Sequence, residues 1–236
     1  MKPDLVYNWL KNIQAKRCML CLSRADTGIE LCHACQMELP WLGAACRRCA
    51  LPLPVDGQLC GQCQNGAPGF TRVIAPFRYA FPLDSLIPAF KYHRQYAFGR
   101  LMAELLTQAL REEYRAQPAP QCLVPMPLHH RRQAQRGFNQ ATELARPVAR
   151  ALQLPLLSDA LQRVRATESQ QGLSAADRRR NLQGAFRCQA AASIEGRHVA
   201  LLDDVVTTGA SVRAASRVLL EAGAEQVSVW CIARTP

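Results

Sequence analysis

The 236-residue sequence has no long apolar run, and this absence excludes a whole class of proteins. No stretch approaches the ~18 consecutive apolar residues that a membrane-spanning helix needs. The N-terminal segment, Met-Lys-Pro-Asp-Leu-Val-Tyr-Asn-Trp-Leu, also lacks the uninterrupted apolar core and the small-residue cleavage site of a secretory signal. The sequence therefore predicts a cytoplasmic protein without a membrane span.

Two nucleotide-binding motifs are also absent. The chain contains no G-x-G-x-x-G, the fingerprint of dinucleotide-binding folds. It contains no G-x4-G-K-[ST] either, so it is not itself an ATP-driven motor. Any phosphate-binding site must be built in another way.

Lysine is scarce, although the chain is strongly basic. Only four of the 29 basic residues are Lys, and the formal net charge is +11. The excess concentrates in residues 129–187, which hold 11 Arg against four acids. The planar guanidinium suits bidentate contacts to phosphate, which favours a phosphate-rich ligand or nucleic acid. An ordinary solvated basic surface explains the charge equally well.

Cysteine, in contrast, is abundant and regularly spaced. Eight of the eleven cysteines form four Cys-x2-Cys knuckles with ten residues between successive pairs: Cys18, Cys21, Cys32, Cys35, Cys46, Cys49, Cys60 and Cys63. Two such knuckles supply the four thiolates of a tetrahedral zinc site, so the array predicts two structural zinc ions. The constant step also indicates an internal repeat of two zinc ribbons. A redox dithiol array is the competing interpretation.

Spacing alone leaves the pairing and the role of the ribbons open. Sequential pairing of neighbouring knuckles is favoured, with a cross-brace of alternate knuckles as the alternative. Residues 18–66 contain few large apolar side chains, so metal must supply folding energy there. The ribbons serve either as a folding and packing module or as a grip on nucleic acid, to which Arg47 and Arg48 would contribute.

Three segments follow from this pattern. Apolar residues recur at helical spacing near the N-terminus, which predicts an amphipathic helix within residues 1–17. The double zinc-ribbon module spans 18–66, and a breaker cluster, Asn65-Gly66-Ala67-Pro68-Gly69, follows it. From residue 70 to 236, apolar strands alternate with amphipathic helices, which predicts an α/β domain with a parallel sheet.

Within the α/β domain we expect strands at 73–79, 122–124, 199–202 and 227–232. Helices are expected within 83–110, which holds one or two, and over 139–152 and 211–222. Gly223 occupies the expected position after the last of these helices.

The strand at 199–202 leads into the most informative segment of the chain. It ends in Asp203-Asp204, and the Thr/Gly/Ser-rich turn 207–211 opens the next helix. In open parallel sheets, ligands bind beyond the carboxyl ends of strands. Such a turn presents N–H groups, hydroxyls and a helix dipole to an anion, whereas the two acids must face sugar hydroxyls or a divalent cation. The combination describes a site for a ribose 5-phosphate.

All thirteen positions of 199–211 resemble the phosphoribosyl pyrophosphate (PRPP) signature of type I phosphoribosyltransferases. The resemblance implies that Asp203 and Asp204 are the catalytic pair that holds the ribose hydroxyls. It also implies a phosphate loop made of Val205, Val206, Thr207, Thr208, Gly209, Ala210 and Ser211. Magnesium is expected with PRPP, bridging the pyrophosphate and the ribose hydroxyls.

A pyrophosphate leaving group needs its own cradle. The segment after the strand 122–124 is where type I enzymes place their pyrophosphate loop, which assigns that role to Pro125, Met126, Pro127, Arg131 and Arg136. By the same resemblance, residues 163–186 correspond to a flexible loop that closes over the site.

Several motifs together resemble the ComF family of competence and DNA-utilisation proteins. They are Val-Pro-Met-Pro-Leu (124–128), Arg-Gly-Phe-Asn-Gln (136–140), Thr167-x2-Gln170-x2-Leu173, Arg-Arg-Asn-Leu-x-Gly-Ala-Phe (179–186) and the PRPP signature. Lys91 also matches a position where that family tends to carry a lysine. The eight-cysteine array is fuller than the single finger of many relatives.

The resemblance implies a function in DNA uptake or utilisation. It predicts a PRPP-binding phosphoribosyltransferase domain with an unknown acceptor, and as partners single-stranded DNA and a competence helicase or ATPase. The alternative is a PRPP-responsive protein that binds nucleic acid or regulates without catalysing transfer. The residues alone identify neither a base-reading hood nor a general base.

Overall fold

The computed structural model describes residues 17–66, 68–165 and 184–236, which divide into two compact units. The first unit ends at Leu39, and the second runs from Pro40 to the C-terminus. The second cysteine repeat therefore belongs to the same unit as the α/β domain. The predicted N-terminal helix lies outside the described residues, as do the motif residues Thr167, Gln170 and Leu173 and most of the predicted closing loop.

The described part of the first unit is a small zinc-ribbon fold. An antiparallel bridge between Arg17 and Arg24 closes the loop that carries Cys18 and Cys21. One short helix, α2 (His33–Met37), begins directly after Cys32. The Cys32 Sγ accepts a 3.5 Å hydrogen bond from the Cys35 amide and thereby caps this helix. The second repeat uses the same plan, with α3 (Gly61–Gln64) beginning after Cys60.

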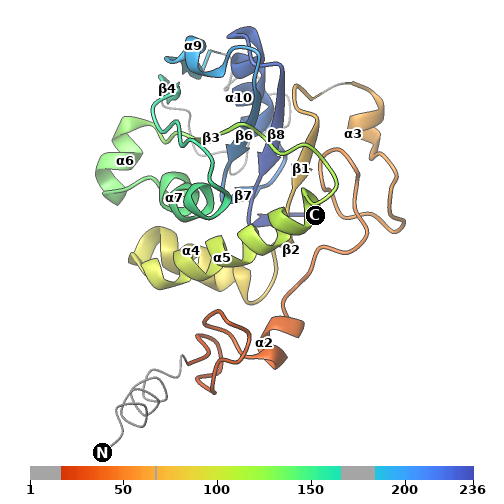
Figure 1. Cartoon of the computed structure of the whole chain (residues 1–236), viewed down its shortest axis with the longest axis vertical. Helices are drawn as coiled ribbons and strands as arrows, with labels where there is room; N and C mark the ends of the chain where they lie inside the picture. Colours follow the sequence, from red (N-terminus) through yellow and green to blue (C-terminus); the bar gives the residue numbers. More distant parts are fainter. Residues whose placement is uncertain (1–16, 67, 166–183) are drawn as a thin grey trace, which may run out of the picture. The chain divides into compact units, whose positions relative to one another are not determined.

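A four-stranded parallel sheet forms the centre of the second unit (Figure 1). Its strand order is β1 (Arg72–Ile74), β8 (Gln226–Trp230), β6 (His198–Leu202) and β3 (Cys122–Pro125). Every residue of β3 and β6 is buried, which explains why both segments read as continuous apolar runs. The expected strands are confirmed within one to two residues at each end, except for the first.

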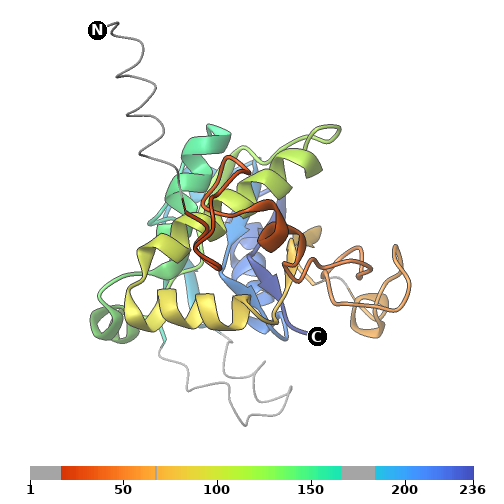
Figure 2. The same cartoon turned by 90° about the horizontal axis from the view of Figure 1, so that it is seen from below.

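Amphipathic helices cover this sheet. They are α4 (Leu83–His93), α5 (Tyr96–Glu113), α7 (Gln140–Leu152) and α10 (Ala210–Glu221). Helices α5 and α7 pack on each other, and α4 lies beside α5 (Figure 1, Figure 2). Helix α10 packs against β8. The connection from β1 through α5 to β3 crosses the sheet in one direction, and the connection from β6 through α10 to β8 runs in the other. Right-handed crossovers therefore place α5 and α10 on opposite faces of the sheet.

The segment 73–79 was predicted as one strand and forms two. Strand β1 ends at Ile74, and β2 (Phe77–Arg78) joins a separate parallel sheet with β9 (Ala233–Arg234) and β7 (Val205–Val206). Pro76 lies between them, and because proline has no N–H it cannot continue a ladder in the middle of a sheet. The chain therefore passes from one sheet to the other at this point.

Short elements that the sequence pattern did not predict lie around the central sheet. These are α6 (His130–Arg136), α9 (Ala191–Ile194) and an antiparallel pair, β4 (Leu161–Arg163) and β5 (Phe186–Cys188). The pair flanks the undescribed segment. Among the described residues, no helix combines the length and apolar character needed to cross a membrane.

Candidate functional site

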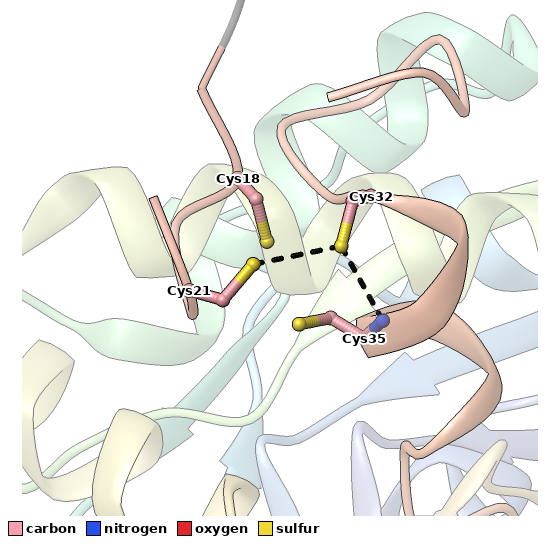
Figure 3. Close-up of side chains that lie close together, drawn as sticks. All are labelled: Cys18, Cys21, Cys32 and Cys35. Atoms are coloured by element: carbon pink, nitrogen blue, oxygen red, sulfur yellow. Dashed lines mark hydrogen bonds between the residues drawn. The ribbon is translucent and has the colours of Figure 1, made fainter. Parts of the chain in front are cut away.

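The eight cysteines gather into two clusters of four. In each cluster all four sulfur atoms lie within 4.8 Å of one another. Figure 3 shows the side chains of the first cluster, Cys18, Cys21, Cys32 and Cys35, converging on a common centre. The second cluster is formed by Cys46, Cys49, Cys60 and Cys63. The sequential pairing is therefore confirmed, and the cross-brace alternative is wrong.

The electrostatics of the clusters suit a cation. Hydrogen bonds from Ser23 and the Cys35 amide lower the pKa of the Cys32 thiol to about 6. Burial raises the pKa of Cys46, but backbone N–H groups of Cys60 and Cys49 outweigh it and bring the pKa to about 6. The hydrogen bonds thus favour the thiolate form of one cysteine in each cluster. Four convergent sulfur ligands fit zinc in a closed, structural coordination with no open position for catalysis.

The acid pair lies at the carboxyl end of the central strand β6. The Asp203 amide donates to the Trp230 carbonyl (2.9 Å), which fixes the chain against β8. Asp204 is nearly buried, at 4% exposure, and its Oδ1 accepts from the Val205 amide (2.9 Å). Asp203 is half-buried, and its Oδ1 accepts from the Asp204 amide (2.9 Å). The backbone thus holds both carboxylates in place.

Two cations from distant segments approach these acids. Lys91, near the end of α4, forms an ion pair with the Asp204 Oδ2. Burial lowers the pKa of Lys91 to about 8, while Asp203 raises it and Arg136 lowers it further. Burial raises the pKa of Asp203 to about 6, against the opposing effect of Lys91 and Arg163. Sequence reasoning noted Lys91 only through the resemblance and assigned no role to Arg163, since nothing local links either to residue 204.

The turn that follows the acids opens helix α10. Val205 and Val206 form β7, so the open part of the predicted phosphate loop is Thr207–Gly209, with Ala210 and Ser211 in the first turn of the helix. Gly209 is the residue before α10 and has φ +75°, a left-handed conformation that side chains disfavour. The Ala210 amide lies 3.4 Å from the Thr208 hydroxyl oxygen. The helix N-terminus and the acid pair lie at the same edge of the sheet.

The predicted pyrophosphate residues lie at the end of the neighbouring strand β3. Pro125, Met126 and Pro127 are all buried. The Met126 amide donates to the Leu202 carbonyl (2.7 Å), and the two prolines have no N–H, so this stretch offers no free backbone donor. Arg131 is exposed on α6, whereas the Arg136 guanidinium donates to Gln140 and lies 5.0 Å above the Tyr92 ring.

A cavity of about 750 Å³ opens beside these residues. Its wall is formed by Pro127–Leu128, the start of α7 and the strand β4, with polar side chains that include Asn139, Glu143, Arg146 and Asp159. The cavity lies at the outer edge of the sheet, because β3 is the edge strand. It is large enough for a small organic molecule.

Basic and aromatic side chains gather around the end of α4, the start of α5 and the short helix α6. Tyr92 and Tyr96 are 68% and 43% exposed, and the Tyr96 ring packs on Phe138 with 5.2 Å between centroids. The surrounding arginines are exposed or half-buried: Arg94, Arg131, Arg132 and Arg136. We call these six residues the Tyr/Arg surface. It begins one residue after Lys91, which binds the acid pair.

Comparison with known proteins supports both parts of this description. A double zinc ribbon domain matches residues 9–64, and a phosphoribosyl transferase domain matches residues 137–236. Competence protein F of Haemophilus influenzae is 39% identical over 170 residues, covering 71% of this chain and 74% of that protein. DNA utilization protein YhgH of Escherichia coli has the same identity and coverage. Competence protein ComFC of Bacillus subtilis is 35% identical over 48% of this chain and 44% of its own length.

Solved structures overlap with the chain more weakly. Glutamine PRPP amidotransferase of Bacillus subtilis, solved with ADP and GMP, has a TM-score of 0.36 at 20% identity and covers 55% of this chain and 25% of its own. Hypoxanthine phosphoribosyl transferase of Trypanosoma cruzi has a TM-score of 0.35 at 15% identity, covering 56% and 63%. The sequence relatives, with their shared domains and extensive coverage, establish that this chain belongs to the ComF family of competence and DNA-utilisation proteins.

Proposed function

We propose that the second unit binds PRPP, or a related ribose 5-phosphate compound, and that the protein acts in the uptake or utilisation of DNA. One observation carries the first part: two carboxylates at the end of β6 stand directly before a glycine-containing turn and the N-terminus of α10. Carboxylates accept hydrogen bonds from sugar hydroxyls, and a helix N-terminus favours a phosphate. The second part rests on the names of the relatives.

Magnesium fits this proposal. The two carboxylates are hard oxygen ligands of the kind that Mg²⁺ prefers, and Lys91 neutralises one of them. Asp203 and Asp204 would therefore hold the ribose hydroxyls together with the ion. The ion would supply charge neutralisation for the pyrophosphate, while Asp203 and Asp204 stabilise positive charge that develops on the ribose.

We further propose that the protein transfers the phosphoribosyl group to an acceptor. The bond between C1 of ribose and pyrophosphate would break, and a nucleophile of the acceptor would form the new bond at C1. Arg131 and Arg136 would receive the pyrophosphate, because the buried backbone of Pro125–Pro127 offers no donor for it. The adjoining cavity is the place to search for a bound acceptor.

Calorimetry of the zinc-replete full chain tests the binding step. Ribose 5-phosphate, and PRPP with magnesium, should bind to the wild-type protein. Asp204→Asn should abolish binding, whereas the control Asp159→Asn, at an exposed carboxylate on the cavity wall, should bind ribose 5-phosphate normally. Pyrophosphate release with candidate acceptors then separates an enzyme from a protein that only binds PRPP. No heat of binding with either compound would refute the proposal.

A second function is favoured by the Tyr/Arg surface. Exposed aromatic rings stack on bases, and arginines track a phosphate backbone, so together they fit single-stranded DNA. A helicase-like ATPase partner rests on the family resemblance alone, and a cytoplasmic location stays an expectation from the sequence. DNA binding by the Tyr/Arg surface would also serve the alternative of a PRPP-responsive protein without transferase activity.

The salt dependence of single-strand binding tests this function. Replacing Arg131 and Arg132 with Gln should flatten the slope of log affinity against log salt by roughly one unit for the pair, whereas Arg150→Gln, on the exposed part of α7, should not. Tyr92→Ala should weaken binding without changing the slope, because stacking releases no counterions. If Arg47→Ala in the second ribbon removes binding instead, the zinc module is the DNA-binding element.

A further inference from the structure

Arg234 in β9 links the second cysteine cluster to the predicted phosphate turn. Its side chain is 5% exposed. On one side the Nε donates to the carbonyl oxygen of Cys49, a member of the second cluster (3.0 Å). On the other side the Nη1 donates to the carbonyl oxygens of Val206 (3.2 Å) and Thr207. One guanidinium thus joins residues that lie more than 150 positions apart.

These hydrogen bonds fix the orientation of two consecutive peptide groups. In a trans peptide the C=O and N–H bonds point in opposite directions. Because the carbonyls of Val206 and Thr207 face Arg234, the amides of Thr207 and Thr208 point away from Arg234. Those N–H groups are the donors that a phosphate would need there. Arg234 therefore sets the donor geometry of the turn without contacting the phosphate.

The charge of the second cluster explains why a buried arginine is tolerated here. Among the described residues no carboxylate pairs with Arg234. When zinc is bound by four thiolates, the negative charges exceed that of the ion, and the cluster as a whole is an anion. The guanidinium on the Cys49 carbonyl then has a buried counter-charge.

A second contact joins the same two regions. The Gln62 Oε1, between the cluster residues Cys60 and Cys63, accepts from the Arg213 Nη2 (3.1 Å) in the first turns of α10. Arg213 also lies against Gly209, at 3.6 Å from the position of an added Cβ atom. The knuckle 60–63 therefore contacts the helix whose N-terminus forms the phosphate site. The second cluster lies in the same compact unit as the turn.

We propose that Arg234 is a positioning residue through which zinc in the second cluster controls the affinity of the turn for ribose 5-phosphate. The inference rests on the proposed function of the turn. It assigns a role in ligand binding to the ion held by Cys46, Cys49, Cys60 and Cys63, which lies in the same compact unit as the turn.

Zinc release from the full-length protein provides the test. If the two sites are coupled, ligand binding must strengthen zinc binding by the same factor as zinc strengthens ligand binding. A chelating dye should compete at equilibrium for both ions of the wild-type chain, and saturating ribose 5-phosphate should raise the affinity of the protein for one of them by about fivefold or more. A merely structural arginine would not produce this reciprocal effect.

Variants assign the responding ion. In Cys35→Ser, which retains only the second cluster, the remaining zinc should still respond to ribose 5-phosphate. In Cys60→Ser the remaining zinc should not respond. Arg234→Met should lose the response and weaken ribose 5-phosphate binding, whereas Arg234→Lys, which keeps the charge but not the forked donors, should restore only part of both.

The outcomes separate this inference from the proposed function. If the wild-type chain takes up no ribose 5-phosphate, the proposed function fails and the inference fails with it. If ribose 5-phosphate binds but the affinity for both ions is unchanged, the inference alone is wrong. The wild-type and Cys35→Ser measurements decide whether the second zinc is coupled to ligand binding, and the conservative variant Arg234→Lys tests the role of Arg234 if Arg234→Met does not fold.

Discussion

The ion pair between Lys91 and Asp204 yields a prediction whose size follows from the structure. The perturbation is Asp204→Asn, which removes the carboxylate but keeps a similar shape. The two side chains are 18% and 6% exposed, and breaking such a buried pair typically costs about 3–5 kcal/mol when the remaining charge persists. Lys91, however, has a way to avoid most of that cost.

The lowered pKa of Lys91 limits the loss of stability that Asp204→Asn can cause. Burial brings this pKa to about 8, so at pH 7 the protonated form is favoured over the neutral form by about 1.4 kcal/mol. When Asp204 is replaced, Lys91 can release its proton, and the loss of stability is then limited to about 1.4 kcal/mol. At pH 9.5 Lys91 is already neutral in the wild-type chain, and the pair contributes nothing. The destabilisation by Asp204→Asn should therefore be smaller at pH 9.5 than at pH 7 by about 1.4 kcal/mol.

Urea denaturation of the zinc-replete chain at the two pH values measures this difference, with Asp159→Asn as the exposed control.

The downward direction of the pKa shift of Lys91 has a second consequence. The folded-state pKa of Lys91 lies below the ordinary value of 10.5, so between about pH 8 and 10.5 the unfolded chain binds more protons. The contribution of Lys91 to stability thus rises with pH over this window, and Lys91→Met should remove the rise. A loss of 3 kcal/mol or more in Asp204→Asn, equal at both pH values, would refute the reasoning.

Three further predictions concern the turn, the second acid and the metal clusters. Gly209→Ala should cost about 1 kcal/mol of stability because φ is +75°, and calorimetry should show weaker binding of ribose 5-phosphate. The control Gly196→Ala, at φ +63° and away from the site, should lose a similar amount of stability in denaturation but bind ribose 5-phosphate normally. Ribose 5-phosphate binding should weaken as the pH falls through about 6, because the raised pKa of Asp203 lets that carboxylate become protonated. Titration calorimetry with ribose 5-sulfate, whose sulfate group stays ionised over this range, separates protonation of the protein from protonation of the ligand, and a flat profile would contradict the assignment. Purified protein should contain two zinc ions by elemental analysis and Cys32→Ser one, and a chelator that leaves the metal content unchanged would contradict the cluster assignment.

Local sequence was sufficient wherever one segment carried a complete signal. The regular spacing of the cysteines predicted two four-thiolate clusters, because a Cys-x2-Cys knuckle aims both sulfurs at one ion by its own backbone geometry. The apolar runs at 122–124 and 199–202 predicted buried parallel strands, since both faces of such strands are covered. The helix that opens at the Thr/Gly/Ser turn was likewise visible in the order of residues 203–222.

Only the tertiary structure decided which segments that are distant in sequence come into contact. Lys91 lies 113 positions before Asp204, and no periodicity or spacing relates them. The division of 73–79 between two sheets depends on which partners β1 and β2 find, β8 and β9, and these follow more than 150 residues later. Arg234 appeared as one of many arginines until folding placed it between Cys49 and Thr207. Sequence determines the chemistry available within one segment, whereas the pairing of charges and donors across segments depends on how the sheet closes around them.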